Sequence, residues 1–169
     1  MIRLPELDVE KTASTLVKNI RALFQEKEFE RAILGLSGGV DSALALALAR
    51  EALGEKYIKG IIMPYKTSNP ASQEDAIQLS QKFNTAYEVH PITPMADAYF
   101  ERDPQLDAAR RGNIMARLRM LTLYDLSARD NALVVGTGNK TEILLGYSTL
   151  WGDTACGLNP LGNLYKYQV

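Results

Sequence analysis

Hydrophobic and polar residues follow two alternating patterns along the chain. Short, mainly apolar runs are typical of strands buried on both faces of a sheet. Between them lie longer segments in which apolar residues recur at helical spacing. The pattern predicts strands at residues 31–36, 57–65, 85–92 and 132–138. It predicts helices at residues 7–29, 41–54, 72–83, 93–101 and 106–130, and a further helix that begins at residue 139.

Local signals set the ends of several predicted elements. Asp8 and Ser72 are candidate N-caps of the first and third helices, because their side chains can accept a hydrogen bond from a free backbone N–H. Gly54 is expected to end the second helix. From Trp151 onward glycine, asparagine and proline recur, and this composition predicts loop.

Strands that alternate with helices predict an α/β fold, in which helices cover both faces of a mostly parallel, Rossmann-like sheet. The chain has 169 residues, of which 46% are hydrophobic, and it contains no repeat or low-complexity linker. These features predict a single domain over residues 1–169 with a substantial core.

Charge and cysteine content narrow the classes of function. Lys and Arg total 19 and Asp and Glu total 20, so no overall basic field favours nucleic acid or an anionic membrane. The only cysteine, Cys156, cannot form a disulfide within the chain, which favours a cytoplasmic protein. The N-terminal residues lack the apolar core of a signal peptide, and the longest Ala/Leu run is too short to span a bilayer. We therefore expect a soluble protein without nucleic-acid or membrane partners.

The sequence Ser-Gly-Gly-Val-Asp-Ser, residues 37–42, lies between the first strand and the second helix. Ligands of parallel α/β sheets bind beyond the carboxyl ends of the strands. Gly38 and Gly39 let the backbone turn tightly, and the free N–H groups at the helix start attract anions. Ser37 and Ser42 add hydroxyl donors. The loop therefore has the features of a phosphate cradle.

Asp41 distinguishes this loop from a P-loop, in which a lysine grips the phosphates, and the G-x-G-x-x-G dinucleotide fingerprint is absent. A carboxylate beside phosphates is repulsive unless a cation lies between them, and Mg²⁺ fills that role in many sites. The alternative is a plain glycine turn in which Ser37 or Asp41 caps the helix. The pattern alone does not decide between the cradle and the cap.

The Ser-Gly-Gly-x-Asp-Ser sequence after a strand resembles the pyrophosphatase loop of the N-type ATP pyrophosphatases, which split ATP between the α- and β-phosphates. Within that superfamily the chain resembles the NAD synthetase family. The shared motifs are Asn-x-x-x-Arg-x-Arg-Met at 113–120, Gly-Thr-Gly-Asn-Lys-x-Glu at 136–142, Gly-Tyr-x-Thr-x-x-Gly-Asp at 146–153 and Asn-Pro-x-x-x-Leu-x-Lys at 159–166. The motifs keep their order and spacing, and the resemblance covers most of the chain.

The resemblance implies a role for each matching position. It assigns ATP contacts to residues 37–42 (Val40 included), Thr137 and Lys166. It makes Asp41 and Glu142 the ligands of Mg²⁺, and it groups Lys166 with these two carboxylates as the catalytic set. Arg117 matches the position that binds the dinucleotide substrate.

The chemistry of these residues agrees with the implied roles. Asp41 follows the first strand and Glu142 follows the fourth, so both lie at the same edge of the predicted sheet. Two carboxylates there can share Mg²⁺ with a triphosphate, and Lys166 can offset charge on the leaving pyrophosphate. The alternative for Glu142 is a capping box with Asn139, which would only close a helix start.

The two arginines of the long helix have different predicted environments. The planar guanidinium of Arg117 suits a carboxylate or a phosphate. Arg119 lies two positions further on and so points to another face, and one of the pair is expected in solvent. Arg117 lies one turn beyond Asn113, and this shared face favours Arg117 for the site.

Two positions depart from the ammonia-using members of the family. Leu150 stands where they have a lysine, and Gly157 stands where they have an aspartate. Both changes remove a charged contact to the dinucleotide. The Gly-Tyr-Ser-Thr-Leu-Trp-Gly-Asp segment more closely resembles the synthetase portion of glutamine-dependent members.

The source of nitrogen follows from what the chain contains. No glutaminase portion is present, and Cys156 has no nearby His or Glu to activate it as a nucleophile. His90, the sole histidine, is expected to be structural. We therefore expect nitrogen from free ammonia or from a separate glutaminase subunit. Family members also continue beyond this point, and we expect the domain to lack their C-terminal segment.

The implied function is ATP-dependent amidation of nicotinic acid adenine dinucleotide (deamido-NAD⁺) to NAD⁺. The nicotinate carboxylate attacks the α-phosphorus of ATP, pyrophosphate leaves, and ammonia then displaces AMP from the adenylated intermediate. Two alternatives are another N-type adenylating ligase and a non-catalytic ATP-binding module of the same fold. ATP binding without pyrophosphate release would identify the module.

The resemblance also implies a homodimer with the long helix, around residues 112–129, at the interface. Apolar residues cover more than one face of this helix, which indicates burial on several sides. These residues are Met115, Leu118, Leu121, Leu123 and Leu126. A core helix in a monomer is the alternative.

Overall fold

The computed structural model describes residues 6–169, and in it helices and strands alternate in the predicted order. The helices are α1 (Val9–Glu26), α2 (Val40–Leu53), α3 (Pro70–Lys82), α4 (Thr93–Phe100), α5 (Ala108–Asp130) and α6 (Lys140–Leu145). The strands are β1 (Arg31–Gly35), β2 (Ile58–Ile62), β3 (Ala86–Val89) and β4 (Ala132–Val134), and a short 3₁₀ helix, η1 (Glu55–Tyr57), precedes β2. Residues 1–5 of the predicted domain lie outside the described part.

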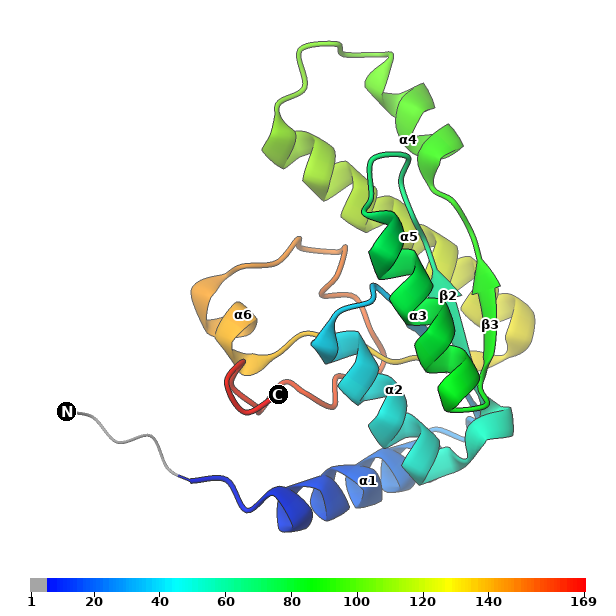
Figure 1. Cartoon of the computed structure of the whole chain (residues 1–169), viewed down its shortest axis with the longest axis vertical. Helices are drawn as coiled ribbons and strands as arrows, with labels where there is room; N and C mark the ends of the chain where they lie inside the picture. The colour runs from blue at the N-terminus through cyan, green and yellow to red at the C-terminus, as the bar shows by residue number, and fades with distance from the viewer. Residues whose placement is uncertain (1–5) are drawn as a thin grey trace, which may run out of the picture.

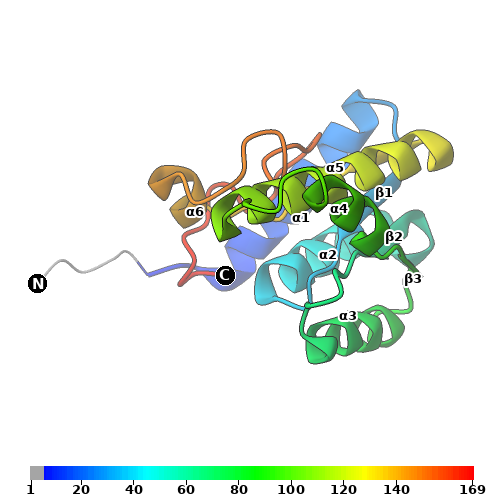
Figure 2. The same ribbon diagram turned by 90° about the horizontal axis from the view of Figure 1, so that it is seen from above.

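The strands form one parallel sheet in the order β3-β2-β1-β4. In its register Leu34 of β1 pairs with Gly60 of β2, and Ile33 pairs with Val134 of β4. Figure 2 shows α2 and α3 on one side of the strands and α4 and α5 on the other. The predicted α/β fold, a parallel sheet with helices on both faces, is therefore confirmed.

Alternate side chains of β1 enter two separate cores, because successive residues of a strand point to opposite faces. Leu34 packs in a cluster with Ile20 of α1 and Leu46 of α2. Ile33 packs in a second cluster with Leu126 of α5 and with residues of β2 and β4. The middle of β1 is thus buried on both faces, which explains why it is a continuous apolar run rather than an alternating one. The edge strand β3, by contrast, is largely exposed.

The predicted helix caps are confirmed except at α3. Asp8 caps α1 and accepts a hydrogen bond from the backbone N–H of Lys11 at 3.0 Å. The cap of α3 is Asn69, whose Oδ1 accepts from the N–H of Ala71 at 3.1 Å, so the prediction of Ser72 is wrong. Pro70 explains the earlier start, because its fixed φ and missing N–H suit the first helical position.

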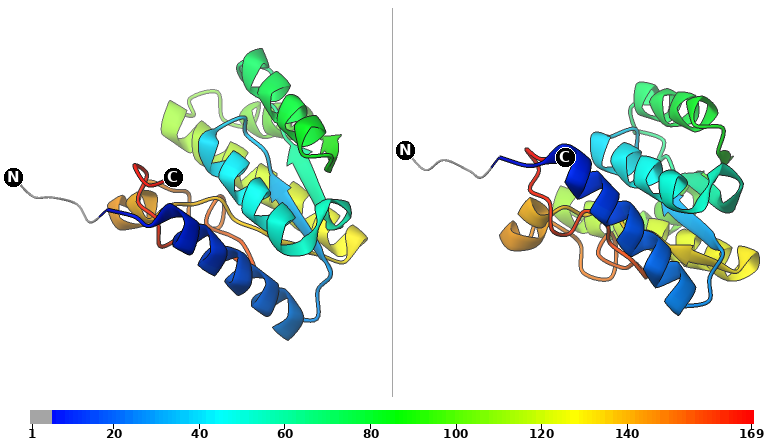
Figure 3. Two further views of the ribbon diagram at one scale, coloured as in Figure 1. Left: turned by 60° about the horizontal axis from the view of Figure 1, so that its bottom comes forward. Right: turned by 90° about the horizontal axis from the view of Figure 1, so that it is seen from below.

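The segment after α6 contains loops and turns, as predicted, and it folds back towards the start of that helix. Leu158 forms an isolated bridge with Val135, and Leu164 O accepts from the N–H of Lys140 at 2.7 Å. The N–H of Lys166 donates to Thr141 Oγ1 at 3.0 Å. Figure 3 shows this C-terminal trace, in red, beside α6 and the beginning of α1. The fold-back brings Lys166 to the carboxyl edge of the sheet.

Because β1, β2 and β4 are parallel, the loops that follow them leave the sheet at the same end. Figure 1 shows α2 and α3, which follow β1 and β2, side by side. No helix within residues 6–169 is long and apolar enough to cross a membrane.

Candidate functional site

The loop after β1 leaves the start of α2 open. Gly39 is the N-cap residue of α2, and no side chain makes a cap hydrogen bond there. Ser37 Oγ accepts from the N–H of Gly39 at 3.2 Å, and Ser42 Oγ donates to Gly39 O at 2.9 Å. These bonds brace the turn without occupying the first amides of the helix. Neither Ser37 nor Asp41 therefore caps the helix. The free amides at the start of α2 give this loop the geometry of an anion cradle.

Gly38 allows this turn to lie close to α3. Its φ is +79°, a conformation that disfavours residues with a Cβ atom. A Cβ atom built at Gly38 would lie 2.3 Å from the carbonyl oxygen of Ser72. The loop is thus held against the first turn of α3, and only glycine fits at this position.

Asp41 and Glu142 come together through Asn139. Asn139 Nδ2 donates to Asp41 Oδ1 at 3.1 Å, and the N–H of Asn139 donates to Glu142 Oε2 at 2.9 Å. Asn139 Oδ1 accepts from the N–H of Glu142 at 3.1 Å, so the capping box expected as the alternative is present at the start of α6. The other oxygen of Asp41 forms an ion pair with Lys166 Nζ. The sequence prediction that these charged residues share one edge of the sheet agrees with the structure.

The donor set around Asp41 fits a magnesium ion that is shared with phosphates. Mg²⁺ is usually held by one or two carboxylates, with phosphate oxygens and water completing its coordination. Asp41 and Glu142 supply hard oxygen ligands of this kind beside the open amides of α2. Within residues 6–169 no cluster of three or more acidic, His or Cys side chains could hold a metal by itself. The two carboxylates therefore fit a metal ion whose remaining ligands come from phosphate and water.

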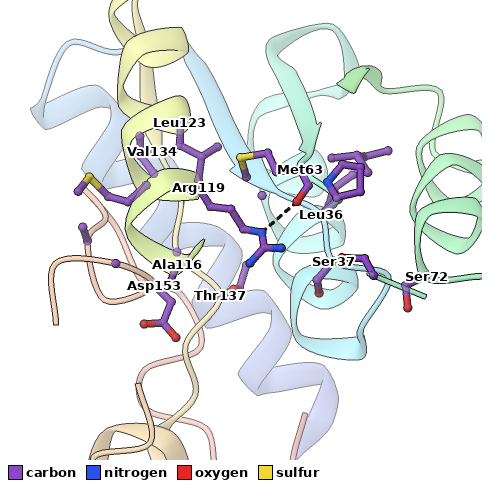
Figure 4. Close-up of a pocket in the computed structure, with 18 of the residues that line it drawn as sticks. Leu36, Ser37, Met63, Ser72, Ala116, Arg119, Leu123, Val134, Thr137 and Asp153 are labelled. Carbon is purple, nitrogen blue, oxygen red and sulfur yellow. Dashed lines mark hydrogen bonds between the residues drawn. The ribbon is translucent and has the colours of Figure 1, made fainter. Parts of the chain in front are cut away.

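A cavity of about 490 Å³ lies next to the cradle, between the ends of β1, β2 and β4. Its walls are largely apolar, and Ser37, Ser72 and Thr137 contribute hydroxyl groups. The charged residues in its lining are Arg119 and Asp153. Figure 4 shows Arg119 extending from α5 into this cavity. The volume and the mixture of apolar walls with a few polar groups are typical of a small-molecule site.

Arg119 is a site residue that sequence reasoning passed over. Its Nε donates to the carbonyl oxygen of Met63 at 2.9 Å, and burial lowers the pKa of its guanidinium. It forms no ion pair with any carboxylate of the described chain. A half-buried cation without an internal counter-charge is costly, so the cavity is electrostatically suited to an anionic ligand.

Arg117 lies outside the cavity. Its side chain is exposed, and its Nε donates to the carbonyl oxygen of Leu150 at 3.2 Å. Asn113, on the same face of α5, bonds Thr149 through its side chain at 2.7 Å. The shared face of Asn113 and Arg117 thus holds the segment at residues 149–150. One of the two arginines was expected in solvent, and the structure shows that it is Arg117. The sequence favoured Arg117 for the site, but Arg119 is the arginine that lines the cavity.

The two positions that depart from the family pattern have different surroundings. The Leu150 side chain is 62% exposed. A Cβ atom at Gly157 would lie 2.4 Å from Leu133 Cδ1, so this backbone has no room for an aspartate without a shift of Leu133.

Cys156 and His90 are not parts of the candidate site. Burial raises the pKa of the Cys156 thiol, which opposes formation of a nucleophilic thiolate. His90 Nε2 bonds Glu88 Oε2 at 2.8 Å in an ion-pair network that also contains Lys59 and Arg129. Hydrogen bonds from Arg129, Lys59 and His90 lower the pKa of Glu88 to about 2. None of these residues lines the cavity, as expected for a structural histidine.

Comparison with known protein sequences identifies a family. The family model described as NAD synthase matches residues 12–169. The NH(3)-dependent NAD(+) synthetase of Fusobacterium nucleatum is 48% identical over 164 residues, which make up 97% of this chain and 64% of that protein. The protein of the same name from Trichlorobacter lovleyi is 54% identical over 140 residues, 83% of this chain and 51% of that protein. The chain therefore spans roughly half to two thirds of the length of these relatives.

Solved structures show the same fold. An NH3-dependent NAD synthetase from Campylobacter jejuni has a TM-score of 0.92 at 40% identity, over 96% of this chain and 71% of that one. A glutamine-dependent NAD+ synthetase from Acinetobacter baumannii, solved with ADP, has a TM-score of 0.91 at 32% identity, over 99% of this chain and 33% of that one. An NMN synthetase from Francisella tularensis has a TM-score of 0.90 at 31% identity, over 96% of this chain and 68% of that one.

Proposed function

Because the chain belongs to the NAD synthase family, we propose that it converts deamido-NAD⁺ to NAD⁺ with ATP and ammonia, releasing AMP and pyrophosphate. The observation that carries this proposal is the open start of α2 beside Asp41, which Asn139 joins to Glu142. This arrangement places anion-binding amides next to two carboxylates, as binding of a magnesium–triphosphate requires.

In the proposed reaction the protein binds, orients and neutralises, and no side chain forms a covalent bond with the substrate. The amides of Val40 and Asp41, with the hydroxyl of Ser37, bind phosphate oxygens at the start of α2. Asp41 and Glu142 would hold Mg²⁺, which supplies positive charge between the triphosphate and these carboxylates. Lys166 balances the charge of the leaving pyrophosphate. It thereby takes over the role that a lysine has in a P-loop. Holding both reactants in one orientation supplies much of the remaining acceleration.

ATP is proposed to occupy the cavity together with the adjoining cradle, with its negatively charged phosphates within reach of Arg119. Thr137 and Ser72 line it from loops and helices that border the cradle, and Arg119 provides its unpaired cation. Arg117 is proposed to contact deamido-NAD⁺ from its exposed position on α5. The two arginines then serve different substrates.

Substitution of the two arginines should separate these roles. Arg119→Met is expected to weaken ATP binding by about 10- to 100-fold, because a hydrogen bond that involves a charged group contributes about 1.5–3 kcal/mol. Arg117→Met, the matched change on the same helix, should leave ATP binding unchanged and weaken deamido-NAD⁺ binding. Titration calorimetry with each ligand measures both effects. Equal ATP affinity in wild type and Arg119→Met would exclude Arg119 from the nucleotide site.

We also propose a homodimer with α5 at the interface. Most of the apolar residues predicted for this interface pack inside the chain, as in a core helix, and Leu126 is buried. Leu121 and Tyr124 of α5, however, are 56% and 41% exposed, and Trp151 is 68% exposed. Leu121→Glu is expected to lower the sedimentation coefficient to that of a monomer, because a charge at an apolar seam remains unpaired. An unchanged coefficient in this variant, or a monomeric wild type, would contradict the placement.

The remaining choices concern nitrogen, location and reaction class. The names of the curated relatives support free ammonia as the nitrogen donor. A glutamine-dependent relative exists as well, so ammonia from a separate glutaminase stays the alternative. Cytoplasmic location stays a prediction from the single cysteine. The other reading of the same fold is an ATP-binding module without turnover.

Pyrophosphate release from Mg-ATP tests the proposed function. Ammonia is present throughout, and deamido-NAD⁺ is added or omitted. Release only with the dinucleotide is the expected result, and NAD⁺ formed in equal amount identifies the product. ATP binding without release under any condition would indicate the non-catalytic module. Release with nicotinic acid mononucleotide in place of deamido-NAD⁺ would instead indicate an NMN synthetase, which is the name of the Francisella tularensis relative.

A further inference from the structure

We propose that Asn139 is a positioning residue that orients the Asp41 carboxylate relative to Glu142 and thereby sets the affinity for a divalent cation with ATP. The inference rests on the proposed function, since it concerns the same magnesium–triphosphate site. Asn139 is fully buried, at 0% exposure, and its side chain bonds both neighbours. It is the internal link between the loop after β1 and the start of α6.

A helix cap alone does not account for this residue. The cap of α6 uses Asn139 Oδ1 and the Asn139 N–H, and both bond Glu142. The Nδ2 group is not needed for the cap, yet it donates to Asp41 at 3.1 Å across a sequence separation of 98 residues. Asn69 caps α3 from an exposed position with its Oδ1 alone. The burial of Asn139 and its second bond therefore indicate a purpose beyond capping.

The two oxygens of Asp41 have different partners. Oδ1 accepts from the buried Asn139, and Oδ2 pairs with Lys166, whose side chain is 49% exposed. An exposed lysine on a flexible stem can move when a triphosphate arrives, whereas a fully buried amide whose nitrogen and oxygen are both hydrogen-bonded is held in place. Asn139 therefore holds the carboxylate in one orientation while Lys166 changes its partner.

The orientation of the Asn139 amide follows from its neighbours. Oδ1 faces a backbone N–H and Nδ2 faces a carboxylate, so the reversed amide would place oxygen against oxygen. The same logic predicts the effect of each substitution. Serine keeps the cap and loses the bond to Asp41, aspartate keeps the cap and adds repulsion, and alanine loses both functions.

The test compares Asn139→Ser, Asn139→Asp and Asn139→Ala with wild type in the full chain. The readouts are calorimetric binding of Mg²⁺ at fixed ATP, the unfolding temperature, and pyrophosphate release. We expect the Mg²⁺ concentration for half-saturation to rise about tenfold in the serine variant and further in the aspartate variant, as is usual when a residue that orients a metal ligand is lost. The unfolding temperature should fall mainly in the alanine variant.

Asn84→Ser is the matched control, because Asn84 Nδ2 also donates to a carboxylate, that of Glu55, at 2.8 Å on the surface. It should leave Mg²⁺ binding unchanged. Wild-type Mg²⁺ affinity in Asn139→Ser, with a loss only in Asn139→Ala, would overturn the proposal and reduce Asn139 to a cap. The binding comparison does not depend on turnover, so it decides the role of Asn139 even if wild type releases no pyrophosphate from deamido-NAD⁺.

Discussion

Asp41→Asn is expected to abolish pyrophosphate release while leaving the protein folded. The substitution keeps the size of the side chain and removes the charge that pairs with Lys166. The new side chain also has an amide nitrogen in place of one carboxylate oxygen, so only its remaining oxygen can accept the hydrogen bond from Asn139 Nδ2. Loss of a charged ligand at the reacting phosphates should lower kcat by roughly 10³-fold, which corresponds to about 4 kcal/mol. A pyrophosphate-release assay at saturating ATP measures the loss.

Stability should change little in this variant. Asp41 lies in the first turn of α2, where its charge contributes about 0.3–1 kcal/mol through the helix dipole. Asp103→Asn is the control, because Asp103 also loses an ion pair, with Arg110 at 3.0 Å, in an exposed loop. Near-normal turnover in Asp41→Asn would refute its role as a metal ligand.

Glu142→Gln extends the same test to the second carboxylate. Glutamine can still accept the hydrogen bond from the Asn139 N–H, so the capping box and α6 should survive. A large loss of turnover with an unchanged unfolding temperature would therefore report the charge and not the cap. Normal turnover would mean that Glu142 only closes the helix.

Gly38→Ala is expected to damage both the fold and the cradle. The added Cβ would meet the backbone oxygen of Ser72 at 2.3 Å, and a φ of +79° disfavours alanine. Left-handed backbone costs an alanine about 1–2 kcal/mol, and the forced shift of α3 adds about 1–3 kcal/mol. For a chain of this size we expect the unfolding temperature to fall by roughly 5–15 °C.

Activity should fall more than stability in Gly38→Ala, because the loop must move away from α3 and displace the first amides of α2. We expect pyrophosphate release to fall by about 100-fold or more even below the unfolding temperature. Gly112→Ala is the matched control, since the added Cβ meets no atom within 4 Å apart from the neighbouring residues and backbone of its own helix. This helix-interior change should stabilise by about 0.5–1 kcal/mol. Full activity in Gly38→Ala would show that the loop does not need this turn.

The order of helices and strands was predictable from residue patterns because local forces set it. Buried strands need continuous apolar runs, as in residues 31–36, and a helix needs its apolar spacing and a cap such as Asp8. The prediction of the α3 cap was wrong because Ser72 and Asn69 are both residue types that cap helices well, and only Pro70 distinguishes the two positions.

The candidate site was predictable only in part. The cradle and the two carboxylates belong to recognisable sequence motifs. The loops that follow parallel strands also lie at one edge of the sheet, so the motifs are expected to meet there. The contacts of Arg119 and Asn139 carry no such signal. Arg119 reaches Met63 across 56 positions of the sequence and Asn139 reaches Asp41 across 98, so neither contact follows from local spacing.

The sequence by itself determined the fold class, the loop at residues 37–42 and the resemblance to the family, because each depends on short-range patterns of residue type. The tertiary structure alone decided which arginine enters the cavity, that Gly38 must touch α3, and that Asn139 joins two carboxylates. These features depend on the packing of segments that are distant in the chain, and residue spacing does not encode that packing.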